Sequence, residues 1–195
     1  MQRKALDRLV SWIGLSLAAL LVVAGALLSW AHTFVGNEVH SQLSAQQIYF
    51  PAKGSPAIAA PEYQAVRKYA GQQLTTGAQA KAYADHFIAN HLKEIGGGKT
   101  YAQLSAQAQA NPTDTKLAGT VQTMFRGETL RGLLLNAYAF DTMGTIAGIA
   151  AIAAYLAAIV MLVLAGLGFW HGRRTSPAEA AFATPAAPRT PATVG

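Results

Sequence analysis

The sequence predicts an all-α membrane protein in which two transmembrane helices bracket a small extracytoplasmic helical bundle. Two stretches without any charged residue, 9–31 and 144–170, carry most of this prediction. At about 1.5 Å rise per residue, each would reach roughly 35–40 Å as a helix, enough to cross a hydrocarbon core of about 30 Å. Between the two stretches, apolar residues recur at helical spacing and strand alternation is almost absent.

Positive charges predict the orientation of the two spans. Arg3, Lys4 and Arg8 precede the first span, and Arg173 and Arg174 follow the second directly. The positive-inside rule therefore predicts that both flanks are cytoplasmic and that the segment between the spans is outside. The predicted order is a cytoplasmic N-terminus at 1–8, a first span at 9–31, an extracytoplasmic helical domain at 32–143, a second span at 144–170 and a disordered cytoplasmic tail at 171–195.

A cleaved signal peptide is the competing interpretation of the first span. The tripeptide at 29–31, Ser-Trp-Ala, resembles a small-x-small cleavage site. However, the apolar stretch is longer than the usual h-region of about 7–15 residues. Trp12 and Trp30 also lie at its two ends, where indole rings prefer the membrane interfaces. Retention as an anchor is the expectation.

Composition excludes several classes of protein. The net charge of +6 comes largely from the flanks of the spans, and no dense basic stripe lies between them, so nucleic-acid binding is not expected. The absence of cysteine excludes disulfides, thiolate metal sites, iron–sulfur clusters and cysteine nucleophiles. The tail from residue 175 is rich in Ala, Pro and Thr, without apolar periodicity, and is predicted to be disordered.

Several helices are predicted between the spans. The first span continues outward to about Gln46, because apolar residues recur every four positions from Val35. A short helix starts at Pro61, and a longer one runs from about Gly77 to Ile95 and stops at the following three glycines. Thr100 caps another short helix that stops at residues 111–112, and a last helix begins near residues 113–114 and continues into the second span.

No residue pattern predicts catalysis or a bound cofactor. His86 and His91 are five residues apart, which places them on different faces of a regular helix, and no histidine pair has metal-ligand or haem-ligand spacing. Glu38 and Asp141 flank the outer ends of the spans and are candidates for a close pair of boundary carboxylates. Nucleophile motifs and phosphate-binding glycine loops are absent from the sequence. We therefore expect no cofactor, no metal and no enzymatic activity.

The segment 126–135 is the densest unusual stretch outside the spans. It combines Arg126, Arg131 and Glu128 with two glycines directly before the second span. One interpretation is a docking or headgroup-binding surface formed by the two arginines. The other is an intrahelical Glu128–Arg131 pair worth a few tenths of a kcal/mol. Glycines inside a helix are unfavourable, which indicates close packing against another element.

Small residues predict where the helices pack. Gly144-x-x-x-Gly148 opens the second span, and the first span offers two counterparts. Such surfaces let helix backbones approach closely, with the other span, a second copy or another membrane protein as partner. The candidates in the first span are Gly14, Ala18, Gly25 and Ser29.

The residues at 39–43 and 48–51, together with Gly-Glu-Thr-Leu-Arg-Gly-Leu-Leu at 127–134, resemble two-span membrane proteins of actinobacteria with no established activity. This resemblance covers the central segment and both spans but not the tail. It implies a bacterial plasma membrane and the two-span topology, and it supplies no catalytic residue.

Three functional hypotheses follow. The first is a non-enzymatic accessory, scaffold or assembly subunit whose partners are the lipid bilayer and a membrane protein or a second copy. The second is a ligand-sensing module that signals through a partner protein. The third is an enzyme acting on lipid or cell-envelope material, with chemistry assembled without a recognisable motif.

Overall fold

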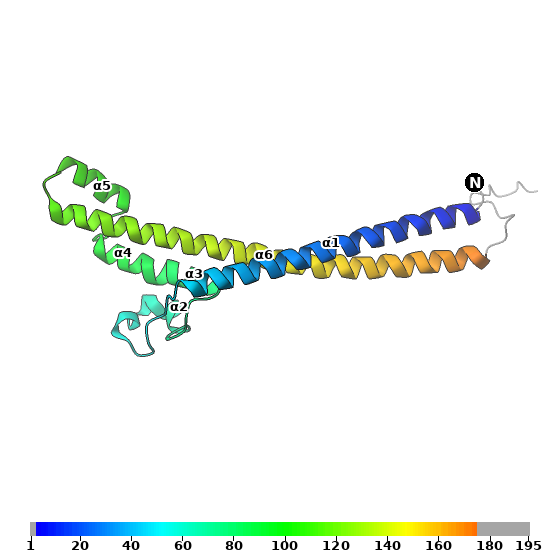
Figure 1. Ribbon diagram of the computed structural model, residues 1–195, viewed down its shortest axis with the longest axis horizontal. Helices are drawn as coiled ribbons and strands as arrows, with labels where there is room; N and C mark the ends of the chain where they lie inside the picture. The colour runs from blue at the N-terminus through cyan, green and yellow to red at the C-terminus, as the bar shows by residue number, and fades with distance from the viewer. Residues whose placement is uncertain (1–2, 175–195) are drawn as a thin grey trace, which may run out of the picture. The chain divides into compact units, whose positions relative to one another are not determined.

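The computed structural model describes residues 3–174, of which 82% are helical, and these residues contain no strand. The prediction of an all-helical chain is therefore confirmed for this range. The chain divides into two compact units (Figure 1). Within the described range, residues 3–28 and 149–174 form the paired-helix unit, and residues 29–148 form the multi-helix unit. Helices α1 (Arg3–Ala45) and α6 (Thr115–Arg174) contribute to both.

The paired-helix unit consists of two antiparallel helices. Near one end, the rings of Trp12 and Phe169 meet edge to face with centroids 5.8 Å apart. Further along the unit, Gly25 of α1 lies against the ring of Tyr155 of α6. Helix α6 continues to Arg174, so residues 171–174, which the sequence assigned to a disordered tail, are helical. The remainder of that predicted tail lies outside the described residues.

Apart from Gly14, the buried positions described in this unit follow a seven-residue repeat. On α1, Ser11, Ala18 and Gly25 are buried, and on α6 the same spacing selects four small residues. A strict seven-residue repeat keeps a helix's contact stripe facing its partner only when the two helices wind around each other with a left-handed twist. The four positions on α6 are Ala151, Ala158, Ala165 and Gly172.

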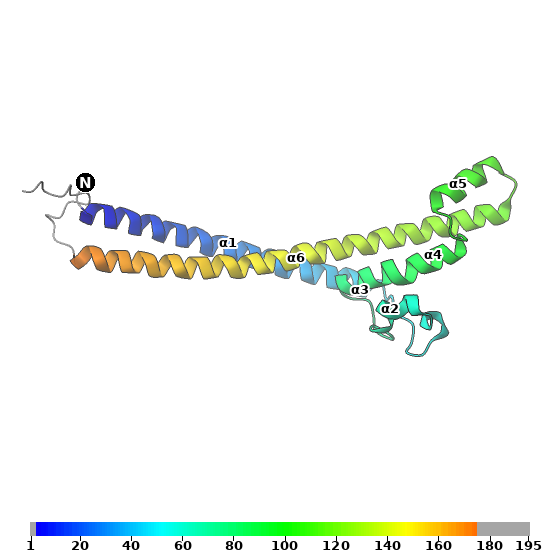
Figure 2. The ribbon, with the colours of Figure 1, turned by 180° about the vertical axis from the view of Figure 1, so that it is seen from behind.

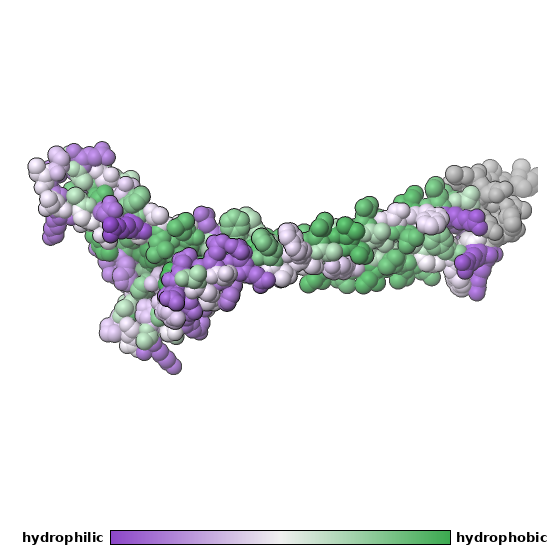
Figure 3. Space-filling model, in the orientation of Figure 1, coloured by the Kyte–Doolittle hydropathy of each residue, from purple (hydrophilic) through white to green (hydrophobic). Residues whose placement is uncertain are grey.

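Large apolar side chains cover the outside of the same pair. Figure 3 shows hydrophobic residues over most of this surface. Both α1 and α6 are long and apolar enough to cross a membrane. A helix pair in water buries its large apolar residues, whereas this pair buries small ones and exposes large ones. Its most exposed members include Leu20, Val23, Leu27, Ile152, Leu156, Ile159 and Leu164.

The multi-helix unit begins with the last turns of α1 and an irregular connector. Helix α1 ends at Ala45, Gln47 adopts a positive φ of 51°, and the chain then runs through the short helices η1 (Pro56–Ile58), η2 (Pro61–Tyr63) and α2 (Gln64–Arg67). Arg67 holds the connector together because its Nη1 lies 2.7–3.2 Å from three successive carbonyl oxygens, those of residues 58–60.

The predicted helix at 77–95 is present, but it contains a π-helical turn. It consists of α3 (Gly77–Ala82), the π turn η3 (Tyr83–Ile88) and α4 (Ala89–Ile95), and Thr76 caps its start through a reciprocal bond with Gln79. One stripe of its buried residues is spaced by four, and in a regular helix each step of four advances such a stripe by about 40° around the axis. The wider π turn absorbs part of this drift and keeps the stripe facing one way. The stripe comprises Ala80, Ala84, Ile88 and Leu92.

The remaining helices complete the unit. Helix α5 (Tyr101–Ala110) starts at the predicted cap Thr100, and α6 starts where Asp114 Oδ1 accepts the amide of Leu117. Figures 1 and 2, seen from opposite sides, place α5 and α4 beside the first half of α6. The core contains Val39, Leu43, Phe50, Ile58, Tyr63, Val66, Leu74, Ala80, Ala84, Ile88, Leu92, Leu104, Met124 and Leu134.

Two glycines set how closely α3–α4 approaches α6. A Cβ on Gly127 would lie 3.1 Å from Leu92 Cδ1 and closer still to Cδ2. A Cβ on Gly77 would lie 2.6 Å from Asp141 Oδ2. Residue numbers rise from 77 to 92 along α3–α4 while those of their contacts fall from 141 to 127 along α6, so the two helices are antiparallel. Close packing against Leu92 therefore explains why a glycine occupies position 127 inside a helix, where glycine is otherwise unfavourable.

The substitutions Gly127→Ala and Gly132→Ala test this contact as a matched pair. Gly127→Ala drives a methyl group into Leu92 and is expected to destabilise the chain by about 1–3 kcal/mol. Gly132 has no atom within 4 Å of an added Cβ, so Gly132→Ala is expected to stabilise it by about 0.5–1 kcal/mol. The measurement is the thermal loss of the helical circular-dichroism signal of the full chain. Equal effects of the two substitutions would contradict the assigned packing.

Candidate interaction site

The structure buries most of the residues that the sequence singled out for helix packing. Gly14, Ala18, Gly25 and Gly144 are buried, whereas Ser29 and Gly148 are half-buried. Gly14 faces Ala165, with 3.5 Å between an added Cβ and the alanine Cβ. The spacing differs from the predicted four-residue ridge, because the buried positions of α6 recur every seven residues. Four-residue ridges are typical of right-handed crossings, and seven-residue stripes of left-handed ones.

His32 is a packing residue that the sequence did not identify as one. In the multi-helix unit its Nδ1 lies 2.8 Å from the carbonyl oxygen of Gly144, and its ring lies against Gly148. The imidazole fits here because Gly148 has no side chain, since a Cβ at that position would lie 3.0 Å from His32 Nδ1. The seven-residue repeat of buried positions on α1 could have identified His32 as a packing residue, because residue 32 falls seven positions after Gly25.

Arg131 belongs to an intramolecular network of charges. Its Nη2 lies 3.4 Å from Asp85 Oδ1, and its Nη1 lies 3.4 Å from Glu128 Oε2, which confirms the intrahelical pair considered from the sequence. Asp85 also accepts from Lys81 Nζ at 2.8 Å. The hydrogen bond from Lys81 is the main reason that the pKa of Asp85 is lowered, with Arg131 contributing in the same direction. Arg131 thus links α6 to the π turn.

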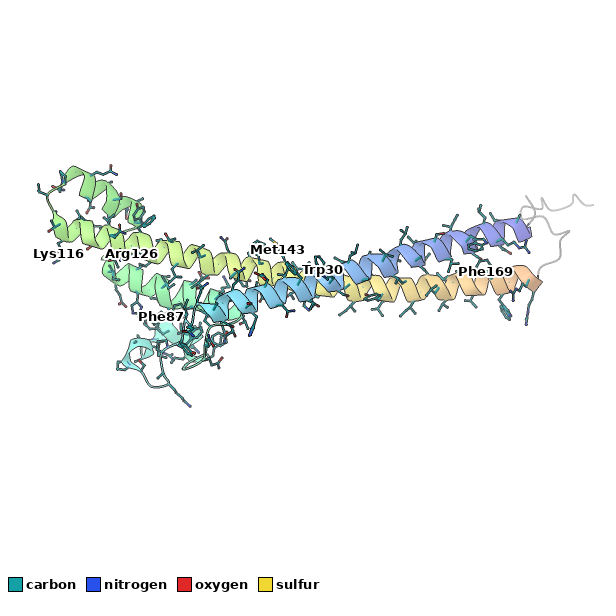
Figure 4. The ribbon with its side chains drawn as sticks, viewed as in Figure 1. Trp30, Phe87, Lys116, Arg126, Met143 and Phe169 are labelled. Carbon is teal, nitrogen blue, oxygen red and sulfur yellow. The ribbon has the colours of Figure 1, made fainter. Side chains whose placement is uncertain are left out.

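Arg126 differs from Arg131 because its side chain is exposed. It makes no hydrogen bond or ion pair with any other described residue. Figure 4 shows Arg126 and Lys116 along the first half of α6. The neighbouring Phe125 is half-exposed and contacts the ring of Tyr101 of α5. Of the two arginines, Arg126 is the one available to a partner.

A groove lies between α1 and α6 in the multi-helix unit. It encloses about 420 Å³ and has mostly apolar walls. Glu38 is the one charged residue of its lining, and its carboxylate accepts from Gln42 Nε2. Within residues 3–174, no basic group lies within ion-pair distance of Glu38. The lining comprises Phe34, Val35, Glu38, Val39, Gln42, Leu43, Gln46, Leu133, Asn136, Ala137 and Phe140.

Glu38 and Asp141, considered from the sequence as a close pair, occupy different surroundings. Glu38 lines the groove, whereas Asp141 packs against Gly77 of α3. No group of three or more potential metal ligands occurs within the part of the chain that the structure describes.

An aromatic cluster occupies the connector side of the unit. The ring of Phe87 contacts those of Tyr83, Tyr63 and His91, with its centroid 4.5 Å from that of the His91 ring. The hydroxyl of Tyr63 lies 3.4 Å from both His91 Nδ1 and Glu94 Oε1. Burial, and then the charge of Glu94, raise the pKa of Tyr63, so its hydroxyl stays protonated and donates. This arrangement stabilises the connector against the π turn.

No family model, curated protein or solved structure matches this chain.

The substitution Gly14→Leu tests the close approach in the paired-helix unit. Leucine at the buried position 14 forces the backbones apart and is expected to destabilise the pair by about 1–3 kcal/mol. The control Gly166→Leu adds the same side chain where no atom lies within 4 Å of the added Cβ. Because the chain has no native cysteine, crosslinking of cysteines placed at positions 12 and 169 measures the approach directly. Equal crosslinking in both variants would contradict the assignment.

Proposed function

We propose that this protein is a non-enzymatic membrane protein of the bacterial plasma membrane. It acts as an accessory, scaffold or assembly subunit that presents the multi-helix unit on the extracytoplasmic side. The observation that carries the proposal is the inverted packing of the paired-helix unit. Small residues fill its interior and large apolar residues cover its surface.

The free-energy cost of exposing apolar side chains to water supports a lipid environment for this unit. In water, exposed apolar surface costs about 25 cal/mol per Å², and a row of half-exposed leucines and isoleucines would amount to many kcal/mol. In lipid the same side chains are solvated, and association depends on close packing between small residues. Backbone groups are also satisfied along both helices, as a hydrocarbon surrounding requires.

The charges at the helix ends support the orientation. Arg8 follows the first turns of α1, and Arg173 and Arg174 form the end of α6. Arg174 stacks on the ring of Trp170 at 4.1 Å, an arrangement suited to a membrane interface with charge on the outer side of the indole. We therefore propose that these flanks are cytoplasmic and that residues 29–148 lie outside.

Reporter fusions test this topology. A reporter that is active only in the cytoplasm should be active after residue 174, and it should be silent when inserted at Gly97, where the chain has a positive φ and is exposed. A reporter active only outside the membrane should give the opposite pattern at the same two positions. Activity of the cytoplasmic reporter at Gly97 would contradict the proposed orientation.

The accessory role rests on the free side chain of Arg126 beside the half-exposed Phe125. An arginine next to an aromatic ring is a frequent component of the energetically important centre of protein interfaces. Lys116, on the same helix, carries the same charge and is also exposed. It provides a matched control for any loss of binding.

Capture of the tagged full chain from membranes in mild detergent tests the role. We expect a membrane-protein partner in constant stoichiometry, with recovery reduced about tenfold by Arg126→Glu because a central arginine typically contributes about 1.4 kcal/mol or more. Lys116→Glu should leave recovery unchanged. A chain recovered alone, or an equal effect of both substitutions, would contradict the accessory role.

The second candidate function is a ligand-sensing module that signals through a partner. The groove between α1 and α6 is the specific observation that favours it, since a concave apolar site with one charged group is typical of small-molecule sites. A sensor would gain thermal stability with its ligand.

A further inference from the structure

We propose that the groove between α1 and α6 binds a lipophilic cation, meaning a small amphiphilic molecule with apolar groups around one positive charge. This binding site goes beyond the accessory role, and it does not depend on the orientation of the chain. The evidence is the combination of apolar walls, two exposed phenyl rings and one carboxylate, that of Glu38, which forms no ion pair within the described chain.

The walls determine that the occupant is largely apolar. Leu133 and Phe140 of α6 are each more than half exposed, and Phe34 of α1 faces the same space. Leu133, Ala137 and Phe140 follow helical spacing, so they form one continuous wall. Covering these side chains removes apolar surface from water, which provides the driving force for binding.

The polar groups determine the sign of the charge. Gln42 Nε2 donates to Oε1 of Glu38, while Oε2 has no protein partner in the described chain. No Lys, Arg or His contributes to the lining. The faces of Phe34 and Phe140 carry negative electrostatic potential, which attracts cations and not anions. Both the Glu38 carboxylate and the phenyl rings therefore attract a positive charge in the groove, and both repel a negative one.

Glu38 also disfavours a second copy of this chain as the occupant. Two identical grooves facing each other would bring two Glu38 carboxylates to the same interface without a cation, and burying unpaired like charges costs several kcal/mol. A cation satisfies the carboxylate that a symmetric dimer would leave unpaired.

Tryptophan fluorescence of the full chain provides the test. Trp30 stacks on Phe34, with centroids 5.4 Å apart, so it reports on one end of the groove. The exposed Trp12 and Trp170 are changed to phenylalanine, and the protein is placed in nanodiscs of zwitterionic phosphatidylcholine. Tetraphenylphosphonium is titrated in parallel with tetraphenylborate, which has the same shape and the opposite charge.

We expect saturable quenching by the cation and none by the anion. Glu38→Gln should weaken cation binding at least about fivefold, as expected for loss of one partly screened ion pair. Glu62→Gln, which removes an exposed carboxylate of the same unit outside the groove, should change nothing. Ala137→Phe should block binding by filling the space.

Three results would overturn the proposal. They are quenching that never saturates, equal responses to the cation and the anion, and equal losses in Glu38→Gln and Glu62→Gln. Because Glu38→Gln is a conservative change on an exposed side chain, the test stands even if Ala137→Phe fails to fold. Loss of the accessory partner in the Arg126→Glu variant leaves this binding intact, so the two proposals fail separately.

Discussion

Close approach of helix backbones at residues with little or no side chain is the constraint on which this structure depends. In the paired-helix unit, α1 and α6 meet at Gly14 and Ala165, and the buried alanines of α6 repeat every seven residues. A seven-residue repeat fixes the direction of the supercoil. Because dispersion forces decline steeply with distance, one bulky residue in this stripe would remove contacts along several turns.

In the multi-helix unit, close approach at glycines packs α3–α4 against α6. Gly127 and Gly77 admit Leu92 and Asp141, and this approach brings Asp85 within reach of Arg131. The π turn follows from the same geometry, since buried residues spaced by four drift around a regular helix unless an extra residue is inserted. Packing at two glycines thus positions both the charge network and the aromatic cluster.

The exposed surfaces follow from what these contacts leave uncovered. With α3–α4 on one side of α6, the side that carries Leu133 and Phe140 faces the groove instead. Glu38 and Arg126 are two of the charged side chains that form no ion pair within the described chain. One offers a carboxylate in an apolar groove and the other a guanidinium on an open helix face, so the two sites suit occupants of different chemistry.

The sequence by itself determined the helical class, the two long apolar helices and most helix ends, because these depend on local signals. Thr100 caps α5, the glycines after Ile95 stop α4, and the small residues at 14, 18, 25 and 144 are buried. Only the tertiary structure decided which face of each helix is covered. The contacts of His32 with Gly144 and Gly148 and the pairing of Arg131 with Asp85 join residues far apart in the chain. Such contacts depend on the register and twist of neighbouring helices, and the residue pattern of one helix does not determine either.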